Sequence, residues 1–479
     1  MTIELSNGAP SAKDNDWNTI NWRKVESEVR RLQVRIAKAV EEKRFGKVKA
    51  LQWILTHSRN AKLLAVRRVT KNRGAKTPGI DGETWLTSKK KIRAIETLSR
   101  KGYKSQPMRR IYIPKKNGKK RPLGIPTMKD RAIQALYQSA LEPIAETTAD
   151  KNSYGFRPGR SCADAIAQCF VLLSRRTSAD WVLEGDIKAC FDKISHSWLM
   201  DNIPMDKKVL SQWLSAGFIH ENVWKETVEG TPQGGVASPT LANMVLDGLE
   251  KVIKQITKRS DKVHMVRYAD DFIITGNSRE ILENKIKPAI KSFLAERGLT
   301  LSDEKTHITY IGEGFDFLGF NIRKYKGKLL IKPSKDSIKS FLANIRETIK
   351  GQRGASAINL IRILNPKIRG WANYYRNVVS KHIFNYVDTN IFQSIWQWCK
   401  RNHPNKADYW IRKKYFPSIE NRNWIFAASG RRSNDERTSV SNLVQAAHIK
   451  IKRHVKIKAE AHPYCRKYKR YFDMRSNSS

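Results

Sequence analysis

The sequence predicts a mixed α+β protein in which helical segments precede and follow a strand-containing body. Three observations predict this fold. Apolar residues recur at helical spacing through residues 22–69, short apolar strands alternate with helical segments through 180–325, and residues 333–400 return to a helical, aromatic-rich pattern. With 479 residues, the chain has room for two or three domains.

The charge of the chain predicts a polyanionic partner. Lys and Arg number 91 against 45 Asp and Glu, which gives a formal net charge of +46. Such a charge repels itself unless a polyanion offsets it, so we expect nucleic acid bound largely through its phosphates. An anionic membrane is the competing partner. The first residues have no basic-then-apolar signal layout and no apolar run is long enough to span a bilayer, so we expect no membrane association.

The cysteines predict a reducing compartment. There are five, they are scattered, and none forms a C-x-x-C pair. We therefore expect reduced thiols in a cytosol, namely the bacterial cytosol or nucleoid. We also expect no zinc site, since no two of the cysteines have ligand spacing.

The amino-terminal part predicts a disordered start over residues 1–20 and then a basic helical pair. Val25, Val29, Leu32, Ile36 and Val40 recur at helix spacing with Arg and Lys between them. Such a pair can pack on the next domain, contact RNA with its exposed face, or do both. A turn-rich stretch over residues 71–85 ends this part.

Residues 110–126, RIYIPKKNGKKRPLGIP, predict a β-hairpin. Ile111 and Ile113 flank Tyr112 in strand alternation, and Asn117-Gly118 is a hairpin turn signal. A helix is expected next, over residues 130–148.

Two acidic segments predict the chemistry. In WVLEGDIKACFD, Asp186 ends an apolar strand, and in HMVRYADDFIIT the acids Asp270 and Asp271 stand between two apolar strands, at the tip of a hairpin. A carboxylate at a buried strand end needs a cation or hydrogen bonds to compensate it. Nucleotide transfer uses two divalent ions about 4 Å apart, and carboxylates suit Mg²⁺. Alone, an acidic hairpin tip is as often only a turn.

The ordered series of motifs resembles the group II intron family of reverse transcriptases. The matching segments are RPLGIPT at 121–127, YGFR at 154–157, DIKACFD at 186–192, TPQGGVASP at 231–239, YADD at 268–271, LSDEKT at 301–306, FLGF at 317–320 and LNPKIRGWANYYR at 364–376. The resemblance implies a right-hand polymerase with fingers and a palm with an antiparallel sheet, then an α-helical thumb or maturase domain and a basic DNA-binding region.

The resemblance assigns roles in catalysis to matching positions. Asp186, Asp270 and Asp271 are expected to hold two Mg²⁺ ions, with Asp271 the weaker ligand and Ile187 supplying only a backbone carbonyl. Lys305 matches the lysine that serves as acid for the pyrophosphate leaving group.

The resemblance also implies a dNTP site. Lys115 and Arg121 would hold the triphosphate, a task suited to charged donors, although neighbouring lysines of the same loop compete for it. Gln233 would pack beside the nucleotide. Phe191 would block a ribose 2′-hydroxyl, and the alternative is a core phenylalanine.

Two further segments are expected to contact nucleic acid. The resemblance implies a primer grip formed by Phe317, Leu318, Gly319 and Phe320. In the thumb, the RNA-binding candidates are Arg369, Trp371, Tyr375 and Arg376. The helical spacing of the thumb aromatics fits core packing equally well, so the arginines are the better candidates.

We expect domain boundaries at 21–85 for the helical extension of the fingers, 86–330 for fingers and palm, 331–400 for the thumb and 401–479 for the DNA-binding region. The tail from residue 401 is expected to be basic and irregular. It holds Cys465 and no H-N-H ligand set, so we expect no endonuclease and priming from a nick, a replication fork or single-stranded DNA.

The expected function is an RNA-directed DNA polymerase and intron maturase that assists splicing of its group II intron RNA and copies it for retromobility. Its partners would be that RNA, template RNA with primer DNA, target DNA and dNTPs, and a homodimer is compatible with this reading. The alternatives are a splicing factor without polymerase activity, and a domesticated reverse transcriptase of a CRISPR-linked or phage-defence system. A template-directed RNA polymerase is a more distant alternative.

Overall fold

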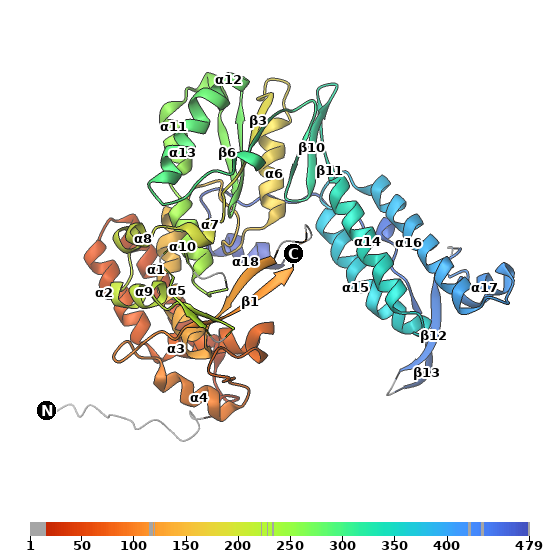
Figure 1. The fold of residues 1–479 in the computed structure, drawn as a ribbon, viewed down its shortest axis with the longest axis horizontal. Coiled ribbons are helices and arrows are strands. Elements are labelled where there is room, and N and C mark those ends of the chain that lie inside the picture. The colour runs from red at the N-terminus through yellow and green to blue at the C-terminus, as the bar shows by residue number, and fades with distance from the viewer. Residues whose placement is uncertain are drawn as a thin grey trace. The chain divides into compact units, whose positions relative to one another are not determined.

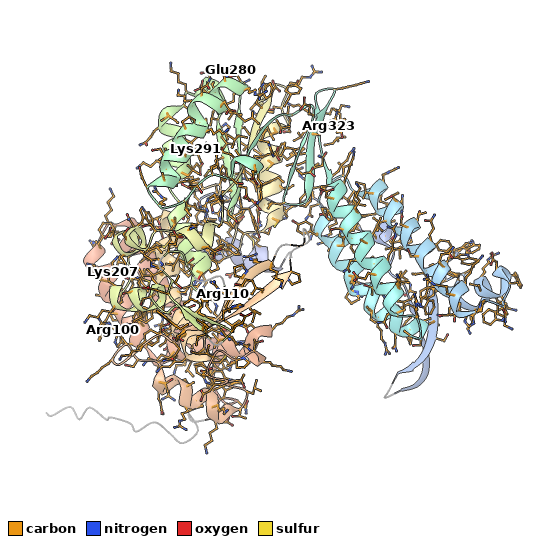
Figure 2. The ribbon with its side chains drawn as sticks, in the orientation of Figure 1. Arg100, Arg110, Lys207, Glu280, Lys291 and Arg323 are labelled. Carbon is orange, nitrogen blue, oxygen red and sulfur yellow. The ribbon has the colours of Figure 1, made fainter. Side chains whose placement is uncertain are left out.

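A computed structural model describes residues 16–114, 118, 120–221, 223–227, 229–231, 234–419, 423–432 and 435–477 (Figure 1). The chain divides into two compact units. Unit 1 comprises Met1–Ser161, Leu183–His307 and Ile457–Ser479, and unit 2 comprises Cys162–Val182 and Ile308–Lys456. Charged side chains such as Glu280 and Lys291 are exposed on the surface (Figure 2). No described helix is both long and apolar enough to cross a bilayer.

Unit 1 begins with helices where the sequence predicts a helical pair, but that stretch forms three: α1 (Trp22–Glu41), α2 (Phe45–His57) and α3 (Arg59–Lys71). A fourth helix, α4 (Ser88–Thr97), was not predicted. The predicted apolar stripe of α1 is confirmed at four of its five positions, because Val25, Val29, Ile36 and Val40 are buried and Leu32 is half-buried. Asn21 caps this helix by accepting a hydrogen bond from the backbone of Lys24. The stripe packs on α3 and on α5 (Met128–Thr148), whose own residues are mostly buried.

The predicted hairpin at residues 110–126 is confirmed in its two strands. Strands β1 (Met108–Pro114) and β2 (Lys120–Ile125) pair antiparallel from Arg109↔Ile125 to Pro114↔Lys120. They belong to a four-stranded sheet of order β2-β1-β4-β5, completed by β4 (Phe218–His220) and β5 (Val223–Lys225).

A second four-stranded sheet, of order β6-β7-β3-β8, carries the predicted acids. Its strands are β3 (Trp181–Asp186), β6 (His264–Tyr268), β7 (Asp271–Gly276) and β8 (His307–Tyr310). The remaining helices of unit 1 are α7 (Cys190–Lys193), α8 (His196–Asn202), α9 (Lys207–Leu214), α10 (Ser238–Leu246), α11 (Leu249–Ile256), α12 (Arg279–Ile281), α13 (Lys287–Ala295) and α18 (Lys469–Asn477). Helix α11 packs against both β6 and α13.

Unit 2 contains a three-stranded sheet and the predicted helices. The sheet has the order β11-β10-β9, from β9 (Phe315–Phe317), β10 (Phe320–Tyr325) and β11 (Lys328–Pro333). The helices are α6 (Cys162–Leu173), α14 (Lys335–Gly351), α15 (Ala357–Tyr375), α16 (Lys381–Asn402) and α17 (Asp408–Tyr415). Helices α14 to α16 confirm the helical pattern predicted for residues 333–400.

The tail is more regular than predicted. Helix α17 and a hairpin of β12 (Ala427–Arg432) and β13 (Asp435–Asn442) follow residue 401. Tyr415, Phe416 and Phe426 are all at least nine-tenths buried, and their rings contact one another. This aromatic cluster stabilises the helix and the hairpin of the tail. The basic composition of the tail had led to the prediction of an irregular segment.

Candidate active site

Asp186 stands at the end of β3, where the strand runs beside β7. The strand is buried at Val182 and Leu183, and Asp186 itself is half-buried. Gly185 faces the Phe272 ring so closely that a Cβ would lie 2.2 Å from Phe272 Cζ. A glycine before the acid therefore lets β3 and β7 come together and places Asp186 beside the next acidic pair.

The turn between β6 and β7 presents the other two acids. The strands pair in register from His264↔Thr275 to Tyr268↔Asp271, which leaves Ala269 and Asp270 as the two turn residues. Ala269 has φ +58°, a left-handed conformation that a two-residue hairpin turn demands. The predicted acidic hairpin tip is confirmed.

A loop from the YGFR motif supports this turn. Tyr154 donates its backbone N–H to the carbonyl of Arg267 at 2.8 Å. Gly155 follows, and a Cβ on it would lie 2.3 Å from the backbone nitrogen of Ala269. A side chain at residue 155 would thus push the acidic turn out of place, so glycine is required by the close approach of two backbones.

The three carboxylates share one electrostatic environment with Lys305. Lys305 Nζ lies 2.9 Å from Asp186 Oδ2, and this hydrogen bond raises the pKa of Lys305. Burial, with repulsion from Asp186, raises the pKa of Asp270. The pKa of Asp271 is raised to about 6, mainly by desolvation and to a smaller extent by repulsion from Asp270 and Asp186. The residue nevertheless keeps an exposed surface. The carboxylates therefore repel one another, and a cation would relieve that repulsion.

The backbone of the 301–306 segment explains how Lys305 reaches the acids. The backbone N–H of Ser302 donates to the carbonyl of Asp186 at 2.8 Å, and Ile187 forms an isolated antiparallel bridge with Leu301. Two pieces of chain more than 100 residues apart are thereby aligned, and Lys305 follows Ser302 by one short turn. The lysine predicted from the family pattern is thus adjacent to Asp186.

A buried ionic network lies behind the acidic turn, and the sequence analysis did not identify it. Arg267 on β6 is 0% exposed. Its guanidinium donates to Asp247 Oδ1 at 2.5 Å, to Asn243 Oδ1 at 3.1 Å and to the carbonyl of Ala269 at 3.3 Å. Asn243 in turn donates to the carbonyl of Gly155 at 2.8 Å. One arginine therefore connects α10, the YGFR loop and the acidic turn.

The predicted nucleotide-binding residues are only partly within the described chain. Lys115 and Gln233 lie outside the described residues. Arg121 is exposed on β2, and its charge opposes the rise in the pKa of Asp270, so it acts on the same site. Phe191 is half-buried, and its ring meets that of Phe156 edge-on at 6.4 Å. Phe156 is 56% exposed, so this aromatic pair has a solvent-facing edge.

The predicted primer grip is a β-turn in unit 2. Phe317 and Phe320 are buried, and Leu318 and Gly319 between them both have left-handed φ values, +52° and +80°. Two thumb tyrosines hold this turn: Tyr374 donates to the carbonyl of Leu318 at 2.9 Å, and the Tyr375 hydroxyl donates to that of Gly319 at 3.1 Å.

The thumb candidates separate into core and surface residues. Tyr375 is 2% exposed, and the Trp371 ring stacks on Phe341 at 4.7 Å, as expected of core packing. Arg369 is exposed and Arg376 is half-buried. The arginines therefore remain the better candidates for RNA contact.

The donor set fits a hard divalent cation. It consists of three carboxylates, in which repulsion by neighbouring acids helps to raise the pKa of Asp270 and of Asp271, and of an ammonium group that pairs with Asp186. An acidic strand end beside an acidic hairpin, next to a basic hairpin, is the arrangement of a nucleotide-polymerising enzyme. This is the class of protein that the fold and the site define.

Comparison with known proteins identifies the family. The model for reverse transcriptase (RNA-dependent DNA polymerase) matches residues 113–322, that for the N-terminal domain of reverse transcriptase matches 17–98, and that for the group II intron maturase-specific domain matches 338–416. The group II intron-encoded protein LtrA of Lactococcus lactis subsp. cremoris is 30% identical, and the match covers 65% of this chain and 68% of LtrA. Protein YkfC of Escherichia coli is 32% identical over 55% of this chain and 80% of its own length.

The chain therefore belongs to the group II intron-encoded reverse transcriptase and maturase family. Among solved structures, telomerase from Candida albicans matches 64% of each chain at 12% identity with a TM-score of 0.38, and we draw nothing from this match.

Proposed function

We propose that the chain copies RNA into DNA by two-metal nucleotidyl transfer at Asp186, Asp270 and Asp271. The observation that carries this proposal is the gathering of these carboxylates from β3 and the β6–β7 turn around the Lys305 ammonium. When bound, two Mg²⁺ ions would activate the primer hydroxyl and neutralise charge on the departing pyrophosphate. The protein side chains supply the rest.

The residues around the acids have distinct tasks. Asp186 and Asp270 would hold the ions, Asp271 would add a weaker ligand, and Ile187 would contribute its backbone carbonyl. Lys305, already held at Asp186, gives a proton to the pyrophosphate. Arg121, with Lys115 beside it in sequence, binds the triphosphate of a dNTP, and Gln233 packs beside the nucleotide.

The Phe191 ring selects deoxyribose. Its partly exposed edge beside Phe156 supports contact with a sugar, because a wholly buried phenylalanine could not meet one. A ribose 2′-hydroxyl would then clash with the ring and lose hydration.

The remaining parts bind nucleic acid. The turn at residues 317–320 supports the primer end, and Arg369 and Arg376 of α15 contact the group II intron RNA whose splicing the protein assists. Splicing assistance is a binding function, in which the basic surface stabilises the native RNA fold. Copying that RNA at a DNA target gives retromobility, in a bacterial cytosol or nucleoid and with the protein as a monomer or homodimer.

Primer extension on an RNA template with Mg²⁺ tests the polymerase. We expect cDNA from the wild type and none from Asp270→Ala, while both assist splicing of the cognate intron equally. Equal cDNA from both proteins, or none from the wild type, would contradict the assignment. Loss of splicing assistance in Asp270→Ala would show that the substitution disturbs the fold rather than the chemistry.

Sequencing of RNA that co-purifies with the chain tests the partner. Intron RNA supports the maturase function. An RNA transcribed beside a CRISPR array or a defence gene would instead support a domesticated reverse transcriptase.

A further inference from the structure

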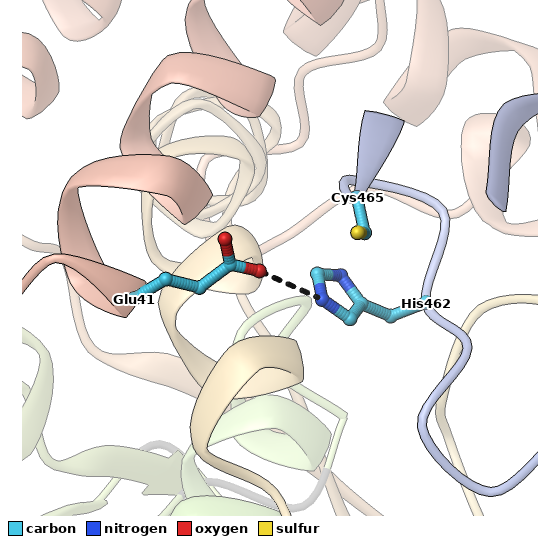
Figure 3. A group of neighbouring side chains, drawn as sticks. All are labelled: Glu41, His462 and Cys465. Atoms are coloured by element: carbon cyan, nitrogen blue, oxygen red, sulfur yellow. Dashed lines mark ion pairs between the residues drawn. The ribbon is translucent and has the colours of Figure 1, made fainter. Parts of the chain in front are cut away.

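A second cluster of metal-ligating side chains lies in unit 1, formed by Glu41, His462 and Cys465 (Figure 3). Among the described residues, this is the group of three His, Cys, Asp or Glu side chains whose ligand atoms all lie within 4.8 Å of one another. The His462 Nε2 to Glu41 Oε1 distance is 4.0 Å. The cluster joins the last residue of α1 to a segment more than 400 residues later.

Local geometry brings the histidine and the cysteine together. The segment His462-Pro463-Tyr464-Cys465 closes a turn, in which the backbone N–H of Cys465 donates to the carbonyl of His462 at 3.2 Å. Figure 3 shows the thiol above the imidazole ring and the Glu41 carboxylate at the ring's other edge. Because the histidine and the cysteine of this H-x-x-C pair lie on one turn, their side chains can reach the same ion.

The imidazole provides an independent indication of a missing ligand. His462 is 7% exposed, and its Nδ1 is buried without a hydrogen-bond partner among the described residues. A buried unpaired ring nitrogen is unfavourable, because it has lost water and gained nothing in return. A cation at this cluster would compensate that unfavourable burial. One ring nitrogen would bind the ion, and the other would face a hydrogen-bond acceptor or water.

The surroundings hold the segment in position before any ion arrives. Arg30 of α1 donates to the carbonyl of Pro463, and its guanidinium lies 4.6 Å from the centre of the buried Tyr464 ring. Arg160 donates to the carbonyl of Ala459 at 2.8 Å. These contacts fix the backbone on both sides of His462, so the ligands are positioned with little further loss of entropy.

The ligand types select the metal. A thiolate, an imidazole and a carboxylate match Zn²⁺ and not Mg²⁺, which prefers oxygen ligands. Two ligands that bind as anions, the Glu41 carboxylate and the Cys465 thiolate, balance the divalent charge of the ion. Because Glu41 is partly exposed, with 49% of its side chain accessible, water can complete a four-coordinate site.

We propose that Glu41, His462 and Cys465 form a zinc site that fastens the carboxyl-terminal segment to the end of α1. The site is separate in ligand chemistry from the Mg²⁺ site at the acidic turn. The role of the zinc site is structural, since the ion links the end of α1 to the carboxyl-terminal segment. Loss of the ion would weaken this link and would remove no catalytic group.

Cobalt substitution in the full chain, purified without an affinity tag, tests the site. Co²⁺ added to the wild type should produce a thiolate-to-cobalt charge-transfer band, and added Zn²⁺ should abolish it. The band should be absent in Cys465→Ser and retained in Cys162→Ser, the matched control, which removes another partly exposed free thiol. A band that persists in Cys465→Ser, or that disappears in Cys162→Ser, would overturn the assignment.

Zinc affinity and thermal unfolding give a second readout that does not depend on polymerase activity. In Glu41→Gln, which alters an exposed helix end and should fold, Zn²⁺ affinity should fall by at least the roughly 10–100-fold typical of losing even an outer-shell partner. Zn²⁺ should raise the melting temperature of the wild type and of Cys162→Ser but not of Cys465→Ser. No shift in the wild type, or an equal shift in Cys465→Ser, would overturn the site even if every variant remained active.

Discussion

The Arg267→Met substitution would test whether the buried network behind the acidic turn determines the stability of the site. Methionine fills much of the arginine volume but removes the donors to Asp247, Asn243 and the carbonyl of Ala269. Asp247 would then be a buried carboxylate without its closest counter-charge. Breaking a buried pair in this way costs about 3–5 kcal/mol. We expect the free energy of unfolding of unit 1 to fall by that amount at neutral pH.

The pH dependence of the loss follows from Asp247. Burial raises its pKa to about 6 from the ordinary value of 3.8, although Arg267 acts in the opposite direction. A raised folded pKa means that the ionised form costs stability above pH 6 and that this cost disappears below the unfolded pKa. Removing Arg267 raises the folded pKa further, so the loss should be largest above pH 6 and shrink on acidification. Asp150 and Arg157 also act on Asp247 and are unchanged by the substitution.

Denaturant unfolding followed by tryptophan fluorescence measures this effect. Arg100→Met is the matched control, because Arg100 pairs with Asp206 at 2.5 Å with 43% of its side chain exposed, and an exposed pair contributes only about 0–1 kcal/mol. The double variant Arg267→Met with Asp247→Leu should recover much of the loss, since it buries no unpaired charge. If Arg267→Met costs no more than Arg100→Met, or costs the same at every pH, the network does not act as described.

Four further outcomes follow from the same structure. Gly155→Ala should lower the primer-extension rate by up to about 10²-fold, because a Cβ would meet the backbone of the acidic turn at 2.3 Å; an unchanged rate would mean that the turn tolerates displacement. Phe191→Ala should raise ribonucleotide incorporation in single-nucleotide assays, and unchanged discrimination would remove its assignment as the sugar gate. Tyr375→Phe should destabilise unit 2 by about 1 kcal/mol through the lost hydroxyl hydrogen bonds, measured by thermal unfolding against an exposed Tyr386→Phe control. Asp271→Asn should raise the melting temperature of the metal-free chain above pH 6 but not well below pH 4, because the folded pKa of Asp271, about 6, exceeds the ordinary value of 3.8. A gain at low pH would contradict this cause.

The acids could be predicted because each of their motifs is local. An apolar run ending in Asp186, and two apolar runs around Asp270 and Asp271, define strands and a turn from a few adjacent letters. The family pattern then supplied Lys305, which the structure places 2.9 Å from Asp186. Local patterns and an ordered series of motifs were therefore enough to find the centre of the site.

The supporting residues could not be predicted in the same way. Arg267 reads as one more cation in a chain with 91 of them, and only its partners on α10 and at the turn reveal its task. Gly155 and Ala269 meet across more than 100 residues, so no spacing in the sequence signals their contact. The same holds for Cys465, which pairs with no other cysteine in sequence and meets a glutamate of α1 in space.

The three acids and Arg267 affect the stability of the site in different ways. Bringing Asp186, Asp270 and Asp271 together raises the pKa of Asp270 and Asp271, so the metal-free site is destabilised by its own charge. Lys305 offsets part of that repulsion through its hydrogen bond with Asp186. Arg267 instead holds the turn by donating to the carbonyl of Ala269, a hydrogen bond that a bound ion would not replace. Metal binding should therefore stabilise the wild type strongly and Asp271→Asn weakly, whereas Arg267→Met should remain destabilised even in saturating Mg²⁺. If Mg²⁺ restored Arg267→Met fully, the arginine would act only through its charge at the acidic site, and its hydrogen bonds to the turn would have no separate role.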